Sequence, residues 1–272
     1  SVLTDDCISK GKDYNSGGAR YNNSYVQFVG LGTITDSLSA IKQMVYEEQS
    51  LSLPSLLHAL DENFEGELDE QPQEVLRQRL LNHVAKYGNN NGLADEVMKR
   101  VFNHCVESVD GVPNAKGGSY RAEMLPTTCH VYFGSVTGAT PDGRKAGRPL
   151  SEGISPVQGA DRNGPTSVIQ SAAKMDHLKT GGTLLNMKLT PSLVEDENGI
   201  DQWASLVRSY FRLGGHHIQF NVVSAQILRE ALEDPEKYRG LIVRVAGYSD
   251  YFCDLGRDLQ QEIISRTEHK AF

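Results

Sequence analysis

Apolar residues recur every three to four positions through much of the first 110 residues. This spacing predicts amphipathic helices over residues 36–46, 53–63, 72–87 and 93–109. Asp36 and Ser52 are the expected N-caps of the first two helices, and Pro54 suits the first turn of the second. A strand is predicted over residues 24–31, and the acidic stretch 62–73 is expected to be an exposed linker.

From Gly111 onward, short apolar runs alternate with helical patterns. The runs predict strands over residues 125–133, 183–189, 217–223 and 241–245. The intervening patterns predict helices over residues 167–175, 200–211 and 225–232. Strands that alternate with helices are typical of parallel βα units, and no flexible linker divides the chain. We therefore predict one domain of the α/β class.

Composition narrows the class of protein. The chain has 272 residues, of which 39% are hydrophobic and 23% are charged, as is ordinary for a soluble globular protein. The net charge of −8 argues against nucleic-acid binding, because no basic stripe could neutralise phosphates. No apolar run approaches the ~20 residues of a membrane span, and no signal-peptide pattern opens the chain. We expect a cytoplasmic protein with neither a nucleic-acid nor a membrane partner.

The cysteines are too scattered to suggest a metal site. They are Cys7, Cys105, Cys129 and Cys253. None belongs to a CxxC pair, and no histidine lies at a spacing suited to zinc. Four free thiols in a reducing compartment are therefore expected, with no metal bound.

Gly247 lies in the most informative segment of the chain. It follows the β-branched run 241–245, which predicts a buried strand. A glycine at a strand end commonly provides a turn with positive φ or allows a close backbone approach. Arg244 precedes it, and Tyr248 and Ser249 follow it. Further along the chain come Gln260, Glu262, Ile263, Ile264, Arg266 and Thr267.

This C-terminal segment resembles the radical-bearing tail of the glycyl radical enzymes. The resemblance covers residues 11–272 and includes several longer motifs. Among them are Gly-Gly-Ala-Arg-Tyr-Asn at 17–22, Gly-Ala-Thr-Pro-Asp-Gly-Arg at 138–144, and Ile-Gln-Phe-Asn-Val-Val at 218–223. An isolated Val-x-Gly-Tyr is usually only a turn, so the extent of the resemblance is what favours the family.

The resemblance implies a fold and a cofactor. The expected fold is the C-terminal half of a ten-stranded glycyl radical enzyme α/β barrel with peripheral helices. Residues 1–130 would be the end of the pyruvate formate-lyase-like barrel domain, and residues 131–272 the glycine radical domain. Gly247 would carry a glycyl radical installed by a separate S-adenosylmethionine-dependent 4Fe-4S activase, with no cofactor bound to the chain itself. The implied partners are this activase, a small polar substrate and, for the full-length enzyme, a second copy in a homodimer.

Chemistry explains why the radical position would be a glycine. Loss of an α-hydrogen leaves an electron that is delocalised into the preceding amide nitrogen and the following carbonyl group. Delocalisation requires a locally planar backbone, and a Cβ would clash with the flanking groups on flattening. The radical also requires exclusion of water and oxygen, which a loop inside a barrel would provide.

Other residues are assigned supporting roles. A strand over 125–133 would line the barrel, with Thr127, Cys129 and Val131 on one face and Thr128, His130 and Tyr132 on the other. Thr127 or Thr128 is the candidate for binding a polar substrate through its hydroxyl. Arg244 is expected to anchor the radical loop through charge-assisted hydrogen bonds, with Tyr248 and Ser249 as further support.

The thiyl cysteine of the family has no counterpart in this sequence. In the dehydratase branch it lies in Gly-Cys-x-Glu, with the glutamate as acid/base, and no such motif occurs here. Cys129 is the only cysteine near the predicted site, and a small buried strand residue is the simpler interpretation. His130 is interpreted as a core histidine. We therefore expect a C-terminal portion of a longer enzyme, whose unpaired strand edges would make it aggregate in isolation.

The resemblance also suggests a reaction. The segments 125–134 and 158–165 resemble trans-4-hydroxy-L-proline dehydratases, which implies radical elimination of water from hydroxyproline. Glycerol or propanediol dehydratase is the first alternative, followed by choline lyase and formate acetyltransferase-like enzymes. Two alternatives of another class are a stand-alone radical-carrying subunit that replaces a damaged glycyl tail, and an inactive remnant that only binds.

Overall fold

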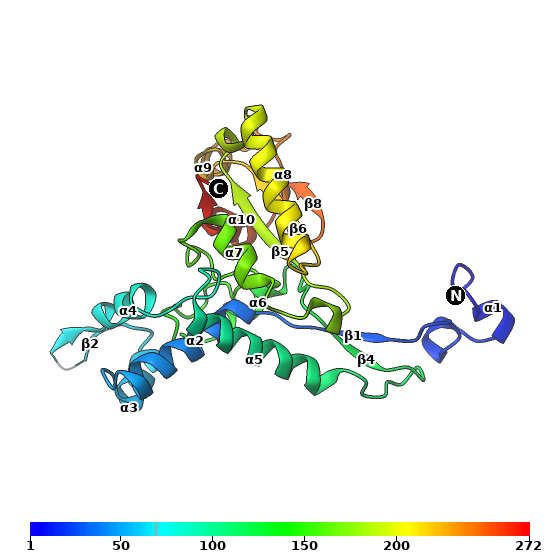
Figure 1. Ribbon diagram of the computed structural model, residues 1–272, viewed down its shortest axis with the longest axis horizontal. Helices are drawn as coiled ribbons and strands as arrows, with labels where there is room; N and C mark the ends of the chain where they lie inside the picture. The colour runs from blue at the N-terminus through cyan, green and yellow to red at the C-terminus, as the bar shows by residue number, and fades with distance from the viewer. Residues whose placement is uncertain (69) are drawn as a thin grey trace.

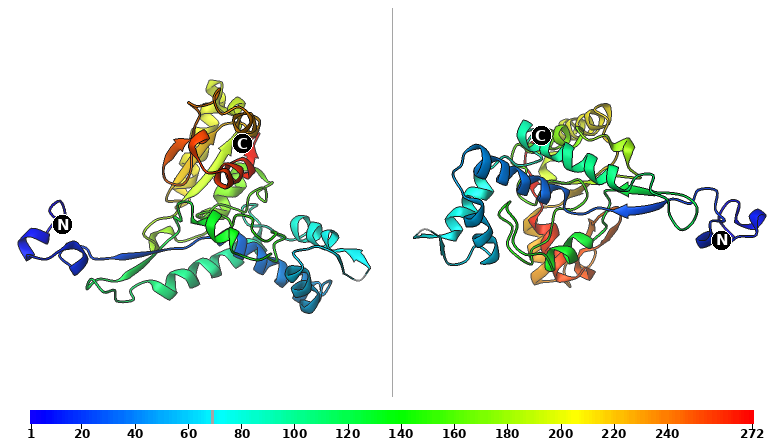
Figure 2. Two further views of the ribbon diagram at one scale, coloured as in Figure 1. Left: turned by 180° about the vertical axis from the view of Figure 1, so that it is seen from behind. Right: turned by 90° about the horizontal axis from the view of Figure 1, so that it is seen from below.

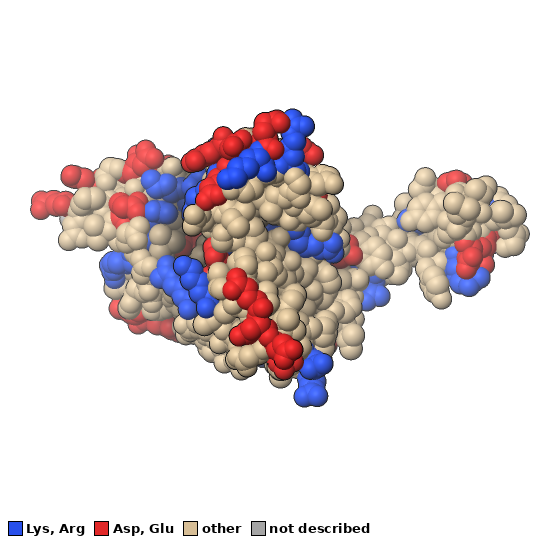
Figure 3. Space-filling view, turned by 90° about the horizontal axis from the view of Figure 1, so that it is seen from above, with Lys and Arg blue, Asp and Glu red and all other residues tan. Residues whose placement is uncertain are grey.

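A computed structural model describes residues 1–68 and 70–272 of the chain. Figure 1 shows a long base formed by the first part of the chain and, standing on it, a rounded upper part that contains the C-terminus. The N-terminal segment with α1 extends away from the body, and Figure 2 shows β1 as the connection between them. Acidic and basic side chains are both present, in small groups, on the face shown in Figure 3.

The base consists mainly of helices. Its elements are α1 (Cys7–Lys10), η1 (Tyr14–Ser16), β1 (Ser24–Gln27), α2 (Leu31–Ala40), the π-helix η2 (Ile41–Glu47), α3 (Leu53–Asp61), β2 (Glu67–Leu68), β3 (Gln71–Pro72), α4 (Gln73–Asn82), α5 (Gly92–Val109) and β4 (Tyr120–Glu123). β1 and β4 form a parallel pair in which Ser24 lies opposite Tyr120. β2 and β3 form a small antiparallel hairpin within the stretch predicted to be a linker, of which residue 69 lies outside the described residues.

Two helices of the base are capped by side chains, and of the two caps only Ser52 was predicted. At the start of α3, the Ser52 hydroxyl accepts a hydrogen bond from the Ser55 backbone N–H, and at the start of α5 the Asn91 side chain accepts from Leu93 and Ala94. These three bonds satisfy N–H groups that have no partner within the helix. The helix predicted over residues 72–87 is shorter than expected, because α4 ends at Asn82.

Asp36 is not an N-cap, contrary to the prediction. α2 begins at Leu31, after Gly30 in the left-handed region, so Asp36 lies inside the helix. Its side chain is buried, and its Oδ1 accepts a hydrogen bond from the Tyr87 N–H at 2.8 Å. Burial is the main reason that the pKa of Asp36 is raised to about 7. The carboxyl group binds α2 to the segment after α4 instead of starting a helix.

The upper part contains the parallel sheet that the sequence predicts. Its elements are α6 (Cys129–Ser135), α7 (Gly164–Ala172), η3 (His177–Lys179), β5 (Leu185–Leu189), η4 (Pro191–Val194), α8 (Glu197–Arg212), β6 (Ile218–Val222), α9 (Ala225–Glu233), β7 (Ile242–Arg244), β8 (Ser249–Tyr251), η5 (Phe252–Asp254), α10 (Arg257–Ser265) and β9 (Glu268–His269). β5 is buried along its whole length and pairs in parallel with β6 on one side and β9 on the other. Among the described residues no sheet closes into a barrel.

The predicted strand over 125–133 is wrong. Thr127 has a φ of +51°, and the Cys129 N–H donates to the Pro126 carbonyl, so the chain turns and continues as α6. Its buried residues are His130 and Gly134, four positions apart, as on one face of a helix. A Cβ at Gly134 would lie 2.4 Å from the Arg148 carbonyl oxygen. Close packing against that backbone, which the local residue types do not encode, explains the helix.

Three hydrophobic clusters hold the parts together. One lies between α5, α7, α8 and β5, a second packs the base helices, and the third surrounds β7 and α10. This last cluster includes Leu184, Val243, Val245, Ala246 and Ile263. It fixes the end of β7 and therefore the position of the segment that follows. None of the described helices is both long and apolar enough to cross a membrane.

Candidate active site at the Gly247 turn

Gly247 lies in the tight turn between β7 and β8. The two strands pair antiparallel, with Arg244 opposite Ser249, and the Val245 N–H donates to the Tyr248 carbonyl at 2.9 Å. Ala246 and Gly247 are the central turn residues, and of the two only Gly247 has a positive φ, +81°. A glycine at this second central position is what type II turns require.

The surroundings of Gly247 are apolar on one side and open on the other. A side chain on its Cα would face one Leu125 methyl group at 3.6 Å and one Leu184 methyl group at 3.7 Å, both ordinary contacts. Val245 and Ala246 are buried, whereas Gly247 and Ser249 are exposed. Packing therefore leaves room for a methyl group here, so crowding is not the reason for glycine. The tip of the turn is uncovered in this chain.

Two side chains bind the peptide groups of Gly247. Its N–H donates to Gln219 Oε1 at 3.2 Å, and its carbonyl oxygen accepts from Arg244 Nη2 at 3.3 Å. Arg244 Nη1 also donates to the Ser249 hydroxyl at 3.2 Å. Arg244, which was predicted to anchor the loop, thus binds Gly247 and Ser249, the two neighbours of Tyr248. The Tyr248 side chain itself is 39% exposed.

Buried amides hold the strand that leads to the turn. Asn221 accepts from the Arg244 N–H and donates to the Arg244 carbonyl, both at 2.7 Å. The Val245 carbonyl accepts from Asn186 Nδ2 at 3.4 Å and from Arg266 Nη1 at 3.1 Å. Because side chains alternate along a strand, Gln219 and Asn221 share one face of β6. The backbone from Arg244 to Gly247 is therefore bound by side chains from three other elements.

Arg266 belongs to a buried ionic cluster behind the turn. Its guanidinium binds both carboxylate oxygens of Glu262, one turn earlier in α10, at 3.1 and 2.8 Å. His130 Nε2 lies 3.5 Å from Glu262, and Gln158 donates to Glu262 at 3.1 Å. Burial alone would raise the pKa of Glu262, but Arg266 and His130 outweigh it and hold that pKa well below its usual range. His130 is the buried histidine that the sequence suggested, and it contacts a carboxylate.

Lys188 adds a buried cation to the same region. Its ammonium group donates to the carbonyl oxygens of Ile264 at 2.9 Å and Ile263 at 3.4 Å, at the C-terminal end of α10. A cation is favourable at a helix C-terminus, but burial is the stronger effect and lowers the pKa of Lys188 to about 8. Lys188 is therefore partly neutral at mildly alkaline pH.

This shift gives a pH-dependent stability that can be measured. Between pH 8 and about 10.4 the unfolded chain binds more protons at Lys188 than the folded protein does, so the unfolding free energy should rise with pH, by about 3 kcal/mol in total. Urea unfolding at pH 7.5 and pH 10 should show this rise relative to Lys188→Met. Exposed Lys270 provides the control, since Lys270→Met should keep the rise. An identical pH profile in wild type and Lys188→Met would contradict the prediction.

The other predicted residues are only partly brought together. Leu125 lies where a side chain on Gly247 would contact it, but Thr127 and Cys129 are exposed and Thr128 is half-buried, on the turn that starts α6. Cys129 is thus not the buried strand residue of the simpler interpretation. Cys253 Sγ donates to the carbonyls of Pro235 and Tyr238, away from the turn. No group of histidine, cysteine or carboxylate side chains among the described residues could hold a metal ion.

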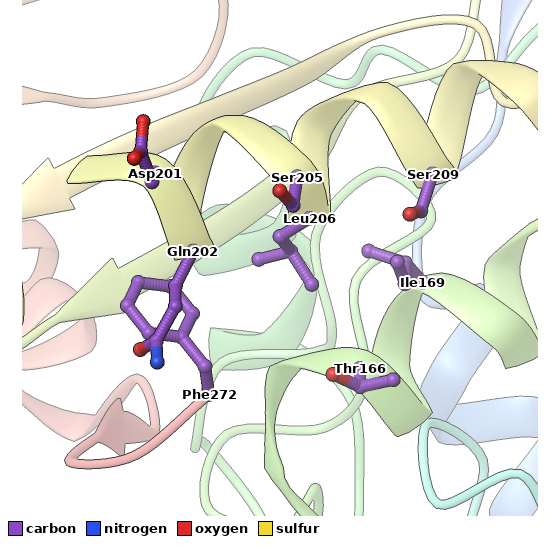
Figure 4. Close-up of a pocket in the computed structure, with 8 residues that line it drawn as sticks. All are labelled: Thr166, Ile169, Asp201, Gln202, Ser205, Leu206, Ser209 and Phe272. Atoms are coloured by element: carbon purple, nitrogen blue, oxygen red, sulfur yellow. The ribbon is translucent and has the colours of Figure 1, made fainter. Parts of the chain in front are cut away.

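A groove in the upper part lies away from these residues. It has a volume of about 430 Å³ between α7, α8 and Phe272, and Figure 4 shows Ser205 and Ser209 from α8 facing Thr166 and Ile169 from α7. None of its lining residues contacts the Gly247 turn. The polar side chains that bind the backbone of the turn itself, Gln219, Asn186 and Arg266, were not assigned as site residues from the sequence, and neither was Asn221, which binds the strand before it. The available signal was the period-2 spacing of the amides in β6.

Comparisons with known proteins identify the relatives of this chain. A family model described as pyruvate formate lyase-like matches residues 1–134, and one described as glycine radical matches residues 150–253. The trans-4-hydroxy-L-proline dehydratase of Clostridioides difficile is 56% identical over 98% of this chain and 33% of its own. The isethionate sulfite-lyase of Bilophila wadsworthia is 42% identical over 91% of this chain and 29% of its own.

Solved structures give the same result. Hydroxyproline dehydratase from Clostridioides difficile, with trans-4-hydroxy-L-proline bound, superposes with a TM-score of 0.93 over 98% of this chain and 33% of its own. The B12-independent glycerol dehydratase from Clostridium butyricum gives 0.93 at 42% identity, over 99% and 34%. The chain spans about a third of the length of these relatives. These matches confirm the predicted fold, a part of the glycyl radical enzyme barrel. The chain therefore belongs to the glycyl radical enzymes of the pyruvate formate lyase-like type.

Proposed function

We propose that this chain is the radical-storage portion of a glycyl radical dehydratase and that Gly247 carries the radical. The Gly247 turn is the observation that carries the proposal. Its glycine has the φ of a turn, room for a methyl group that it lacks, and both peptide groups bound by polar side chains. If glycine were required only because neighbouring atoms leave no room for a side chain, this position would be crowded, and it is not.

The role of the chain in such a reaction follows from ordinary radical chemistry. An activase of the S-adenosylmethionine and iron–sulfur type would remove one hydrogen atom from the Gly247 Cα. The resulting radical would take a hydrogen atom from a cysteine S–H, leaving a thiyl radical and restoring glycine. The thiyl radical would in turn take a hydrogen atom from substrate, and the substrate radical would lose water. The product radical would then take the hydrogen atom back from the cysteine, which restores the thiyl radical. Arg244 and Gln219 would hold the turn in place throughout.

The cysteine of this relay is proposed to come from protein outside these 272 residues. The atoms nearest to a side chain on Gly247 belong to Leu125 and Leu184, and Cys253 is engaged with backbone carbonyls. The exposed tip of the turn also requires a covering partner, either in the same chain or in another. A second candidate function, a separate radical-carrying subunit, is favoured by this same exposure.

The proposed substrate is trans-4-hydroxy-L-proline, because the relative that shares 56% of residues is a dehydratase of that compound. Thr127 is the candidate for binding it, with Thr128 next to it. Thr127 has a φ of +51° although it is β-branched. It is exposed and follows Leu125 by two residues, and a Leu125 methyl group lies 3.6 Å from where a Cβ on Gly247 would be. Strained backbone of this kind is concentrated at functional sites. The activase, a homodimer and a cytoplasmic location complete the proposal.

Thr127 should show a conflict between stability and function. We expect Thr127→Gly to raise the unfolding free energy by about 1 kcal/mol, because glycine adopts a positive φ without strain. The same change should lower kcat/KM for hydroxyproline dehydration by removing the hydroxyl. Thr127→Ser keeps that hydroxyl and is the matched control. A glycine variant with full activity would rule out the binding role.

The proposed function is tested by anaerobic activation. The protein that carries this chain is incubated with a radical S-adenosylmethionine activase and examined by electron paramagnetic resonance. A doublet from the remaining Gly247 α-hydrogen is expected, and exposure to air should then cleave the chain at Gly247, as mass spectrometry would show. Activated, oxygen-exposed protein that stays intact would overturn the assignment. Product analysis with hydroxyproline, glycerol and propanediol would distinguish the substrates.

A further inference from the structure

We propose that Gln219 is a positioning residue that, together with Arg244, controls how the unpaired electron of Gly247 is distributed over its two peptide groups. This inference rests on the proposed radical at Gly247 and adds a residue to that site. Gln219 is 6% exposed, lies on β6, and is 28 positions from Gly247 in the sequence.

The contacts form a closed ring around Gly247. Gln219 Oε1 accepts from the Gly247 N–H at 3.2 Å and from Arg244 Nε at 2.9 Å. Arg244 Nη2 donates to the Gly247 carbonyl at 3.3 Å, which completes the ring. Gln219 thus accepts from the Gly247 N–H, Arg244 donates to the Gly247 carbonyl, and the two side chains are hydrogen-bonded to each other.

The orientation of the Gln219 amide is fixed by a relay of hydrogen bonds. The Val245 carbonyl can only accept, so Asn186 must direct its Nδ2 toward it. Asn186 Oδ1 then faces Gln219 Nε2, which donates to it. This leaves Gln219 Oε1 for the Gly247 N–H and Arg244 Nε, both of which are donors. All these partners require the same orientation of the Gln219 amide. Flipping the amide would break three hydrogen bonds, those to the Gly247 N–H, to Arg244 Nε and to Asn186 Oδ1.

This arrangement favours delocalisation of a radical on the Cα. Delocalisation draws electron density from the amide nitrogen and places it on the carbonyl oxygen. An acceptor at the N–H stabilises the positive charge that develops on the nitrogen, and a guanidinium at the oxygen stabilises the negative charge. Both hydrogen bonds therefore strengthen as the electron spreads away from the Cα. The ring should lower the spin density on the Cα and lengthen the life of the stored radical.

The test uses the activated protein and compares the doublet splitting in the electron paramagnetic resonance spectrum, which reports spin density at the Gly247 Cα. Gln219→Met removes the acceptor with little change in side-chain length, so a wider splitting and faster anaerobic decay are expected. Gln219→Glu keeps an oxygen at both donors, so a splitting equal to or narrower than that of the wild type is expected. Asn221→Leu is the matched control: it removes bonds to Arg244 from the same face of β6 but does not touch Gly247, so the splitting should be unchanged.

The outcomes separate this inference from the proposed function. No doublet in the wild type would overturn the assignment of Gly247 itself. A wild-type doublet with the same splitting and decay in Gln219→Met would overturn only the role of Gln219. A wider splitting in Asn221→Leu as well would show that general loosening of the turn is the cause, which also overturns it. If Gln219→Met does not fold, a wider splitting in Gln219→Glu decides against the proposal, and an equal or narrower one supports it.

Discussion

Gly247→Ala is expected to abolish radical formation and all activity while leaving the protein folded. An α-carbon radical on alanine would have to flatten with a methyl group between the flanking carbonyl and amide groups, which opposes delocalisation. The loss should therefore be complete rather than partial. Activity of the activated protein and its electron paramagnetic resonance doublet both report on it.

The accompanying loss of stability should be small. The methyl group would meet Leu125 and Leu184 at 3.6 and 3.7 Å, so nothing has to move to accommodate it. Holding alanine at a φ of +81° costs about 1–2 kcal/mol, which urea unfolding can measure. A mixed α/β protein of this size should retain its fold after such a loss.

Gly214→Ala is the matched control for the backbone strain. Gly214 has a φ of +96° and open space where a Cβ would lie, and it is in the turn between α8 and β6. We expect a similar loss of stability but an unchanged doublet. If Gly247→Ala retained measurable activity, Gly247 would not be the radical position. If Gly214→Ala also lost the doublet, strain alone would explain the effect.

Arg266→Met is expected to cause the largest loss of stability, about 3–5 kcal/mol. Arg266 is 8% exposed and its partner Glu262 1%, so removal of the guanidinium leaves a carboxylate buried without its cation. The change also removes a donor from the Val245 carbonyl, two residues before Gly247. Chemical unfolding measures the loss, and the radical yield after activation should fall because the turn is less well held.

The double variant Glu262→Gln with Arg266→Met separates charge from packing. Because it leaves no unpaired charge, it should recover most of the stability that the single variant loses. In the single variant the pKa of Glu262 should rise above that of the unfolded chain. The destabilisation should therefore be smaller at pH 5 than at pH 8, since protonation then removes the buried charge. A loss that is the same at both pH values and in both variants would show that Arg266 acts through packing alone.

The sequence predicted secondary structure correctly where an element is determined by residues within a few positions of it. The cap residue Ser52 binds an N–H group three positions away, so the start of α3 was predicted from the sequence, whereas α5 was predicted from its apolar spacing alone and its Asn91 cap was not. The strand predicted over residues 183–189 is present as β5, and the structure shows all five of its residues buried, although Asn186 and Lys188 are polar. Gly247 belongs to this group, because a positive φ at a strand end favours glycine whatever lies nearby.

Local signals failed where a distant segment decides the outcome. Asp36 has the chemistry of an N-cap, but its carboxyl group binds the Tyr87 backbone 51 positions away and lies inside α2. The β-favouring run after Thr127 becomes α6, because Gly134 fits against the backbone around Arg148 and His130 reaches Glu262. β7 was expected to be buried, yet Ile242 is 57% exposed because its strand forms an outer hairpin with β8.

The family, the Ser52 cap of α3, the strands of the parallel pair β5 and β6, and the glycine at the centre of the candidate site can all be recognised from the residues of this chain. The side chains that bind this glycine could not be, because they come from distant parts of the chain. Gln219 and Asn221 are visible as alternating amides in a strand, but their partners depend on β7 lying beside β6. Arg266 reaches Val245 only because α10 packs behind the turn. Hydrogen bonds between distant segments depend on where the backbone is placed, and hydrophobic packing determines that placement over the whole chain.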